Sequence, residues 1–360
     1  QGLPGPFIGC PACSWYLCPG CASTACPHAY LVLVNRATNL LLRRAHARLI
    51  APLAAALAGE EHLLIVPDRD LYALPFAALR DAEGTHLIER HSVRVAPSIG
   101  TLVELEKRRA AAAIAAQGET DDKRQVLVVG NPSFAGWTVG DDGQTHKEQL
   151  PGASEEANAV EEIFEEKGAD FEVDLVKGKR ATKARVVEAM RGSDVVHLAT
   201  HGEPEGLFFA GTSAAEATLS MAEVHALELR RTRLVVLSAC DTFKGELRSD
   251  GVVGITRAFV AAGAPTLVAS LWKVDDAATL ELMRRFYREL LEDEDGDVRG
   301  NAAVAMRKAM VWMLKGTKKQ SFSVLQWAAF VVYGLSGSID NDATPLPCAT
   351  NNGGNEEDSV

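Results

Sequence analysis

Residues 194–202 read D-V-V-H-L-A-T-H-G, and residues 234–242 read L-V-V-L-S-A-C-D-T. Each stretch is a short apolar run that leads directly into a reactive residue, His201 in the first and Cys240 in the second. Runs of this length predict strands that are buried on both faces, as in a parallel sheet. Open α/β sheets bind their ligands at the carboxyl ends of the strands. If these strands are neighbours, His201 and Cys240 are therefore predicted to face one crevice.

The same alternation extends along the chain from about residue 29. Short apolar runs alternate with longer segments of helical period, which predicts parallel strands joined by crossover helices. The predicted fold class is α/β, with a mainly parallel sheet flanked by helices on both faces. The expected strands are 31–34, 63–66, 93–96, 126–129, 171–176, 194–199, 234–238, 266–271 and 330–333, and the expected helices are about 38–58, 98–116, 154–168, 181–191, 252–262, 275–292 and 299–314.

Composition excludes several classes of protein. Hydrophobic residues make up 47% and charged residues 24% of the 360 residues, as is ordinary for a globular protein. The 37 Lys and Arg against 48 Asp and Glu give a net charge of −11 without a dense basic block, so we expect neither nucleic acid nor an anionic membrane as partner. No apolar run approaches the ~20 residues of a spanning helix. No G-x-x-x-x-G-K-[ST] or G-x-G-x-x-G loop is present, so we expect no nucleotide-type cofactor.

Five of the seven cysteines lie within the first 26 residues. The units C-P-A-C and C-P-G-C, followed by Cys26 and His28, offer thiolate and imidazole ligands of the kind that zinc prefers. Only four residues separate the two units, however, so a poorly ordered leader without metal is the preferred interpretation. Because Cys240 is the one cysteine of the predicted globular body, we expect no structural disulfides and a reducing, cytoplasmic location. The chain begins with Gln1, so we expect a fragment or a processed product.

These observations divide the chain into a leader over residues 1–28, a globular part over 29–338 and a tail over 339–360. The polar segment 117–124 is expected to separate a smaller N-terminal portion, 29–116, from the main catalytic sheet, 125–338. After residue 336 the chain is rich in Asn, Asp, Gly, Ser and Thr and has little apolar surface to bury, so we expect disorder there.

A cysteine and a histidine at neighbouring strand ends have a specific chemical use. A thiolate is a strong nucleophile, and a histidine can protonate a leaving amine near neutral pH. The backbone N–H groups of Gly202 and Cys240 are candidates for an oxyanion hole. The alternative for Cys240 is a small buried hydrophobic residue. His197, inside the strand, is interpreted as a core histidine outside the dyad.

Three segments carry a family resemblance: V-V-H-L-A-T-H-G at 195–202, L-V-V-L-S-A-C-D-T at 234–242 and S-L-W-K-V-D-D-A-A-T at 270–279. They resemble the hallmark segments of the CHAT domain, a family of caspase-like and separase-like cysteine peptidases. The resemblance spans about residues 29–338 and includes the segments at 63–79, 126–132, 150–157, 251–264 and 327–334.

The resemblance implies the caspase–hemoglobinase fold, with His201 and Cys240 as the catalytic dyad of a cysteine endopeptidase that cleaves protein substrates without a metal or cofactor. It also implies a regulatory partner, since tetratricopeptide repeats often accompany this domain and are missing here. A catalytically idle scaffold module remains the alternative.

Substrate preference is the least determined property. The segment L-W-K-V-D-D at 271–276 resembles a separase segment that recognises a basic side chain at P1, the residue before the cleaved bond. Asp275 and Asp276 are therefore candidates to line S1, the pocket that binds the P1 side chain. The preferred alternative is that one of them caps the following helix. Asp241, beside Cys240, is a third candidate for substrate contact, although a turn-stabilising role ranks first.

Overall fold

The computed structural model describes residues 8–10, 15–17, 27–115, 123–134, 149–168, 170–203, 206–239, 246–248, 251–292, 300–316 and 321–335. Contacts divide the chain into two compact units. The first comprises residues 1–62 and 76–91, and the second comprises residues 63–75 and 92–360.

The first unit is dominated by a long helix, α1 (Pro27–Leu49), which is followed by the short helical segments η2 (Ala51–Leu53), α2 (Ala54–Leu57), η4 (Phe76–Ala78) and α3 (Leu87–Arg90). The strands β1 (Ile8–Cys10) and β2 (Trp15–Leu17) form a separate antiparallel pair. The predicted strand at 31–34 is wrong, because these residues belong to α1. Leu, Ala and Arg dominate the rest of that helix, and their helix propensity outweighs the strand preference of two valines.

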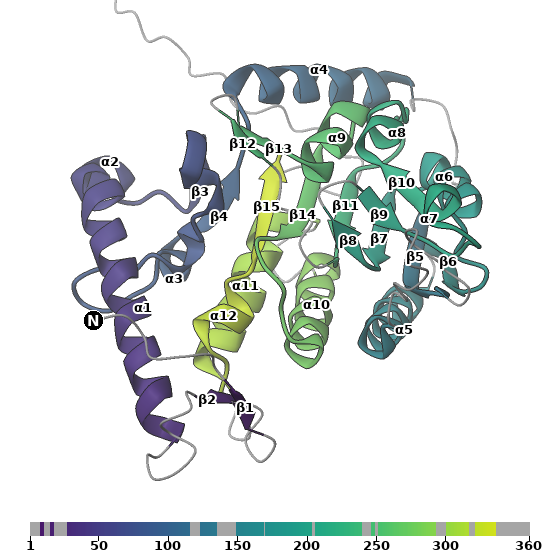
Figure 1. The fold of residues 1–360 in the computed structure, drawn as a ribbon. Coiled ribbons are helices and arrows are strands. Elements are labelled where there is room, and N and C mark those ends of the chain that lie inside the picture. The colour runs from purple at the N-terminus through teal and green to yellow at the C-terminus, as the bar shows by residue number, and fades with distance from the viewer. Residues whose placement is uncertain are drawn as a thin grey trace, which may run out of the picture. The chain divides into compact units, whose positions relative to one another are not determined.

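The second unit is built around an eight-stranded sheet with the order β3-β4-β15-β14-β11-β7-β5-β6 (Figure 1). From β14 to β6 all neighbours run parallel, whereas β15 is antiparallel to β14 and parallel to β4. The strands are β3 (His62–Ile65), β4 (Ser92–Val95), β5 (Arg124–Pro132), β6 (Phe171–Gly178), β7 (Val195–Ala199), β11 (Leu234–Leu237), β14 (Thr266–Ser270) and β15 (Phe330–Gly334). The predicted fold class is confirmed.

The polar segment at 117–124 does not interrupt this sheet. Strands β3 and β4 precede that segment and β5 follows it, yet all three belong to the same sheet. The N-terminal portion therefore supplies the edge strand β3 and its neighbour β4 to the sheet that carries the candidate site.

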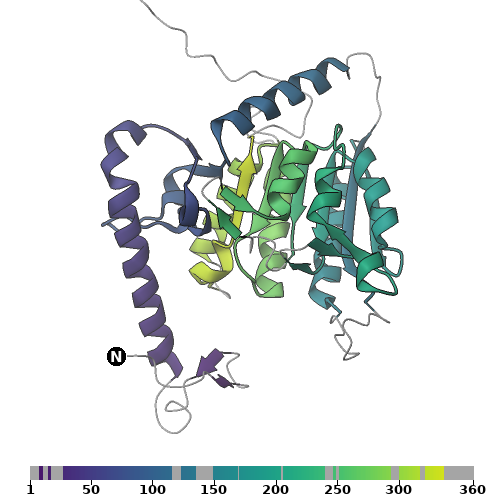
Figure 2. The ribbon, with the colours of Figure 1, turned by 45° about the horizontal axis from the view of Figure 1, so that its top comes forward.

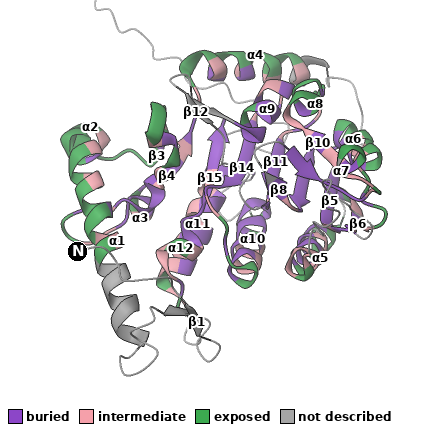
Figure 3. Cartoon of the chain, viewed as in Figure 1, coloured by how far each residue is buried: buried purple, intermediate pink, exposed green. Residues whose placement is uncertain are grey.

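Helices cover both faces of the sheet (Figures 1 and 2). One layer contains α5 (Pro151–Glu166), α10 (Asp276–Leu291) and α11 (Ala302–Lys315), in which α10 packs between the other two. The other contains α4 (Ile99–Ala115), α6 (Lys183–Gly192), α8 (Met221–His225) and α9 (Ile255–Ala262). The central strands between these layers are buried along their length, as Figure 3 shows.

Several short elements lack a clear sequence signal. Strands β8 (Gly202–Glu203), β9 (Gly206–Phe208) and β10 (Thr218–Ser220) form a small antiparallel sheet after β7. The helix expected from residue 252 begins at Ile255, because residues 251–253 pair as a strand instead. The remaining short elements are η3 (Arg69–Ala73), α7 (Ala214–Ala217), β12 (Glu246–Arg248), β13 (Gly251–Val253) and α12 (Val324–Trp327).

Candidate active site

The two strands that lead to the reactive residues are neighbours. Strand β7 pairs in parallel with β11, and Leu198 of β7 is the register partner of Leu237 of β11. Each leucine lies three residues before its reactive residue, Leu198 before His201 and Leu237 before Cys240. The register therefore ends both strands at the same carboxyl edge of the sheet. The two strands are neighbours, as the prediction of a shared crevice requires.

His201 lies just beyond the end of β7 and is half-buried. Its carbonyl oxygen accepts a hydrogen bond from Phe208 N at 3.0 Å, which fixes the backbone at this position. Its ring packs against Phe134, with ring centroids 5.1 Å apart and an interplanar angle of 54°. Phe134 is fully buried and follows β5, so a neighbouring strand end supports one side of the imidazole.

Gly202 is the register partner of Leu207 in the small antiparallel sheet. Hydrogen-bonded and non-hydrogen-bonded pairs alternate in such a ladder. Because Phe208 N donates to His201 O in the adjacent pair, this alternation directs the N–H of Gly202 away from β9. The oxyanion role of this N–H beside His201 remains a prediction.

The two residues before Cys240, Ser238 and Ala239, are both hydrogen-bonded to neighbouring strands. Ser238 N donates to Leu198 O at 3.0 Å, and the carbonyl of buried Ala239 accepts from the Ser270 hydroxyl at 3.2 Å. Cys240 and Asp241 themselves lie outside the described residues. Strands β7 and β14, which flank β11, thus both anchor the segment that leads into the cysteine.

The two acidic candidates for the S1 pocket have different environments. Asp275 is the N-cap of α10: its carboxylate accepts from Ala278 N at 3.1 Å, and its carbonyl accepts from the N–H and hydroxyl of Thr279. Asp275 is therefore a helix cap, which was the preferred alternative to a substrate contact.

Asp276 begins α10 and lies against Gly152 in the first turn of α5. A Cβ atom on Gly152 would overlap both the carboxylate and the Cβ of Asp276, so this close approach requires glycine. Burial raises the pKa of the Asp276 carboxyl, and the charges of Asp275 and Glu156 raise it further, against the opposing effect of Lys273. A carboxylate with a raised pKa is one that gains from a nearby cation.

A buried polar network lies directly before the candidate dyad on β7. His197 is fully buried, with Nδ1 3.0 Å from the Tyr287 hydroxyl and Nε2 3.2 Å from Oε1 of Glu156. Burial raises the pKa of Tyr287 well above its ordinary value, so this residue remains a neutral phenol. Nδ1 of His197 thus has a hydrogen-bond partner in Tyr287, whereas Nε2 and Glu156 Oε1 are in close contact without hydrogen-bond geometry. Sequence reasoning missed Glu156, Tyr287 and Phe134, because no local pattern distinguishes them from ordinary helix and loop residues.

The described part of the chain contains no group of three or more His, Cys, Asp or Glu side chains arranged to hold a metal ion. The side chains of the cysteines in the leader lie outside the described residues, so the zinc alternative remains a prediction. Within the described ranges, no helix is both long and apolar enough to span a membrane.

Known structures share this fold. The yeast separase–securin complex (Saccharomyces cerevisiae) matches with a TM-score of 0.50 at 15% identity over 76% of this chain and 16% of that one. The Arg-specific cysteine proteinase gingipain R matches with a TM-score of 0.50 at 12% identity over 89% of this chain and 70% of that one. A complex of the pro- and mature domains of the Porphyromonas gingivalis enzyme RgpB gives a TM-score of 0.51 at 11% identity, with coverage of 89% and 71%. At these identities the likeness concerns the fold alone.

Sequence comparison gives the family. Human tetratricopeptide repeat protein 28 is 26% identical over 84% of this chain, and the mouse protein of that name is equally similar. The chain spans only 13% and 14% of the length of these relatives. The model of the CHAT domain matches residues 39–335, which is most of the chain and includes both His201 and Cys240. The chain therefore belongs to the CHAT domain family.

Proposed function

We propose that the chain is a cysteine endopeptidase whose dyad is His201 and Cys240. The observation that carries this proposal is the register of β7 and β11, in which Leu198 pairs with Leu237 and each precedes its reactive residue by three positions. A nucleophile and a proton donor at adjacent strand ends are the minimal requirement for acyl transfer.

The reaction then proceeds in two steps. The Cys240 thiolate attacks the carbonyl carbon of the cleaved peptide bond, and the negative charge moves to the carbonyl oxygen. His201 protonates the leaving amine as the C–N bond breaks, which leaves an acyl-enzyme thioester. Water, deprotonated by His201, attacks the thioester and regenerates the thiolate. The N–H groups of Gly202 and Cys240 stabilise the oxyanion in both steps.

For substrate preference we propose a basic residue at P1, read by Asp276. Asp276 has a carboxyl group of raised pKa at the start of α10. Asp275 is already engaged as a helix cap, and Asp241 remains a further candidate in the segment after the nucleophile. If Asp276 does not read P1, the segment 203–220 that follows His201 is the alternative determinant.

The deciding experiment identifies the cleavage sites in a peptide library. The library is incubated separately with the wild-type chain, with Cys240→Ala and with His201→Ala. Cys348→Ala is the matched control, because it removes a thiol in the tail. We expect cleavage only with wild type and Cys348→Ala, at Arg or Lys in P1. Wild-type cleavage rates in Cys240→Ala would refute the peptidase proposal. A wild-type chain that cleaves nothing, alone or with an added tetratricopeptide-repeat protein, would favour an idle scaffold module.

Regulation by a partner is part of this proposal. The similar yeast structure is a complex of separase with securin, and the curated relatives are named for tetratricopeptide repeats. We therefore propose that a repeat-containing segment or another regulatory protein controls access to the dyad. We also propose a cytoplasmic location for the chain.

A further inference from the structure

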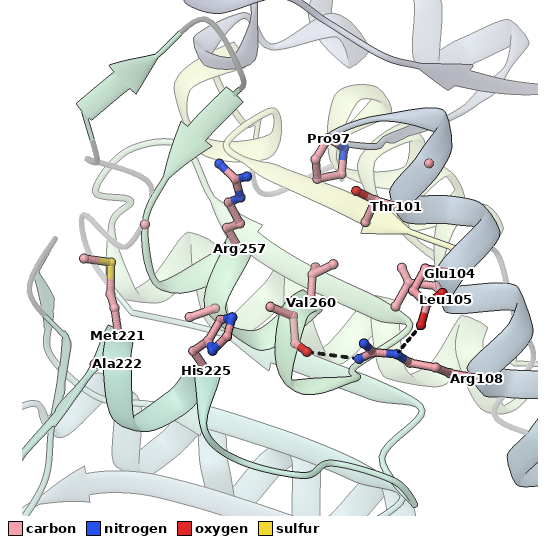
Figure 4. A pocket seen from close by; sticks show the side chains of 14 residues that line it. Pro97, Thr101, Glu104, Leu105, Arg108, Met221, Ala222, His225, Arg257 and Val260 are labelled. Carbon is pink, nitrogen blue, oxygen red and sulfur yellow. Dashed lines mark hydrogen bonds and ion pairs between the residues drawn. The ribbon is translucent and has the colours of Figure 1, made fainter.

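An open groove of about 740 Å³ lies between α4 on one side and α8 and α9 on the other (Figure 4). Its size is within the range of small-molecule pockets, about 300–1,000 Å³. Leu105 and Val260 form apolar parts of its lining, while Arg108, His225 and Arg257 place basic groups around it. Arg108 is held by Glu104 at 3.1 Å and by the carbonyl of Ala261 at 3.0 Å.

The chain leaves the sheet at this groove. Leu335, the last described residue, forms a buried cluster with Ala96, Leu102, Leu105 and Val260, and the last two of these line the groove. Three hydrogen bonds fix the backbone at the end of β15. Leu335 N donates to Pro265 O at 2.8 Å, and Leu335 O accepts from the Thr266 hydroxyl at 2.8 Å. Gly334 O accepts from the Arg94 guanidinium at 2.9 Å. Any chain beyond residue 335 therefore starts beside the groove.

The following residues suit the groove in chemistry and length. Residues 336–360 contain five acidic residues and no Lys or Arg. Within them, residues 339–348 read I-D-N-D-A-T-P-L-P-C and combine apolar Ile339 and Leu346 with acidic Asp340 and Asp342. Because an extended chain advances about 3.3 Å per residue, the few residues between Leu335 and this segment are enough to reach the groove.

We propose that residues 339–348 of the same chain dock in the groove between α4, α8 and α9. The apolar side chains of the segment contact the apolar lining, and its two aspartates lie near Arg257 and His225. Tethering makes a weak contact sufficient: a short flexible linker gives an effective concentration of about 1 mM, so a segment with a Kd of ~0.1 mM is bound about nine-tenths of the time. This docking does not depend on the peptidase proposal.

Photocrosslinking in the full chain tests the contact. p-Benzoylphenylalanine replaces Ala222, an exposed residue that lines the groove, or in a control chain Glu188, an exposed residue of α6. We expect irradiation of the first chain to join position 222 to peptides from residues 336–360 at the mass of a monomer, and the control to yield no such product. A crosslinked dimer would show that a second copy fills the groove and would overturn the proposal, as would the absence of tail peptides.

Charge reversal tests the recognition itself. Asp340→Lys with Asp342→Lys should reduce the crosslinked yield roughly two- to tenfold, since each exposed ion pair contributes modestly. The matched control, Glu356→Lys with Glu357→Lys, makes the same change of charge outside the docking segment and should leave the yield unchanged. Arg257→Glu should partly restore the yield of the Asp340→Lys, Asp342→Lys chain. Equal losses in both double variants would mean that only the net charge of the tail matters, which would refute docking of residues 339–348.

Discussion

The Nε2 atom of His197 lies 3.2 Å from Oε1 of Glu156, where strand β7 packs on helix α5. On the other side of the ring, Nδ1 lies 3.0 Å from the hydroxyl of Tyr287 in α10. The histidine thereby connects the strand that leads to His201 with two helices of one layer. Its contribution is structural, and its removal should be measurable as stability.

Tyr287→Phe should lower the free energy of unfolding by about 1–3 kcal/mol, because it leaves a fully buried ring nitrogen of His197 without its partner. Urea unfolding followed by circular dichroism measures the change. Tyr72→Phe is the comparison, since that hydroxyl donates to the carbonyl of Pro97 at 2.9 Å in a part-buried position and should cost less. Equal stability of Tyr287→Phe and wild type would show that the hydroxyl contributes nothing to the network.

Cys240 should react with iodoacetamide at pH 7 faster than Cys348 in the same chain, and His201→Ala should slow that reaction about tenfold. An adjacent imidazolium increases the thiolate fraction, and the thiolate is the reactive form. Mass spectrometry of the alkylated peptides over time gives both rates, with Cys348 as internal reference. Unchanged alkylation of Cys240 in His201→Ala would mean that the two side chains do not interact.

Asp275→Ala should cost about 1 kcal/mol of stability, the usual effect of removing an N-cap. Asn301 caps α11 in the same helix layer, where its side chain accepts from Ala303 N and Val304 N, so Asn301→Ala is a matched control. Neither variant should change the preference for the P1 residue. A selective loss of cleavage after Arg and Lys in Asp275→Ala alone would instead assign a substrate contact to Asp275.

Asp276 should produce a pH-dependent penalty on folding. Its pKa is raised in the folded state above the ordinary value of 3.8, so its charged form opposes folding. The penalty is absent in acid, where the group is protonated in both states, and grows as the pH rises through the folded-state pKa. Asp276→Asn should therefore raise the melting temperature at pH 7, and by much less at pH 3. A gain of the same size at both pH values would contradict this origin.

The sequence was most informative where a single segment determines the outcome. The strands β7 and β11 are continuous apolar runs and are buried along their length, so the sheet and the pairing of these two strands were predictable. The cap of α10 was also predictable, because Asp275 and the first turn that it caps are adjacent in the chain.

Features that depend on distant partners were not predictable. Tyr287 lies 90 positions from His197, and nothing local to either residue indicates their contact. The valines near residue 32 predicted a strand, although the surrounding residues extend a helix through them. The small sheet of β8, β9 and β10 consists of strands of two or three residues, too short to show a period of two.

The place of β15 in the sheet has a consequence for biosynthesis. Strand β4 ends at Val95, but it borders β15, which begins at Phe330 and separates β4 from β14. During translation at about 5–20 residues per second, β4 must wait tens of seconds for this neighbour to leave the ribosome. Until then β4 presents an unpaired strand edge that favours aggregation. A premature stop codon before residue 330 would therefore leave the N-terminal strands without a sheet to join, and such a product should depend on chaperones or be degraded.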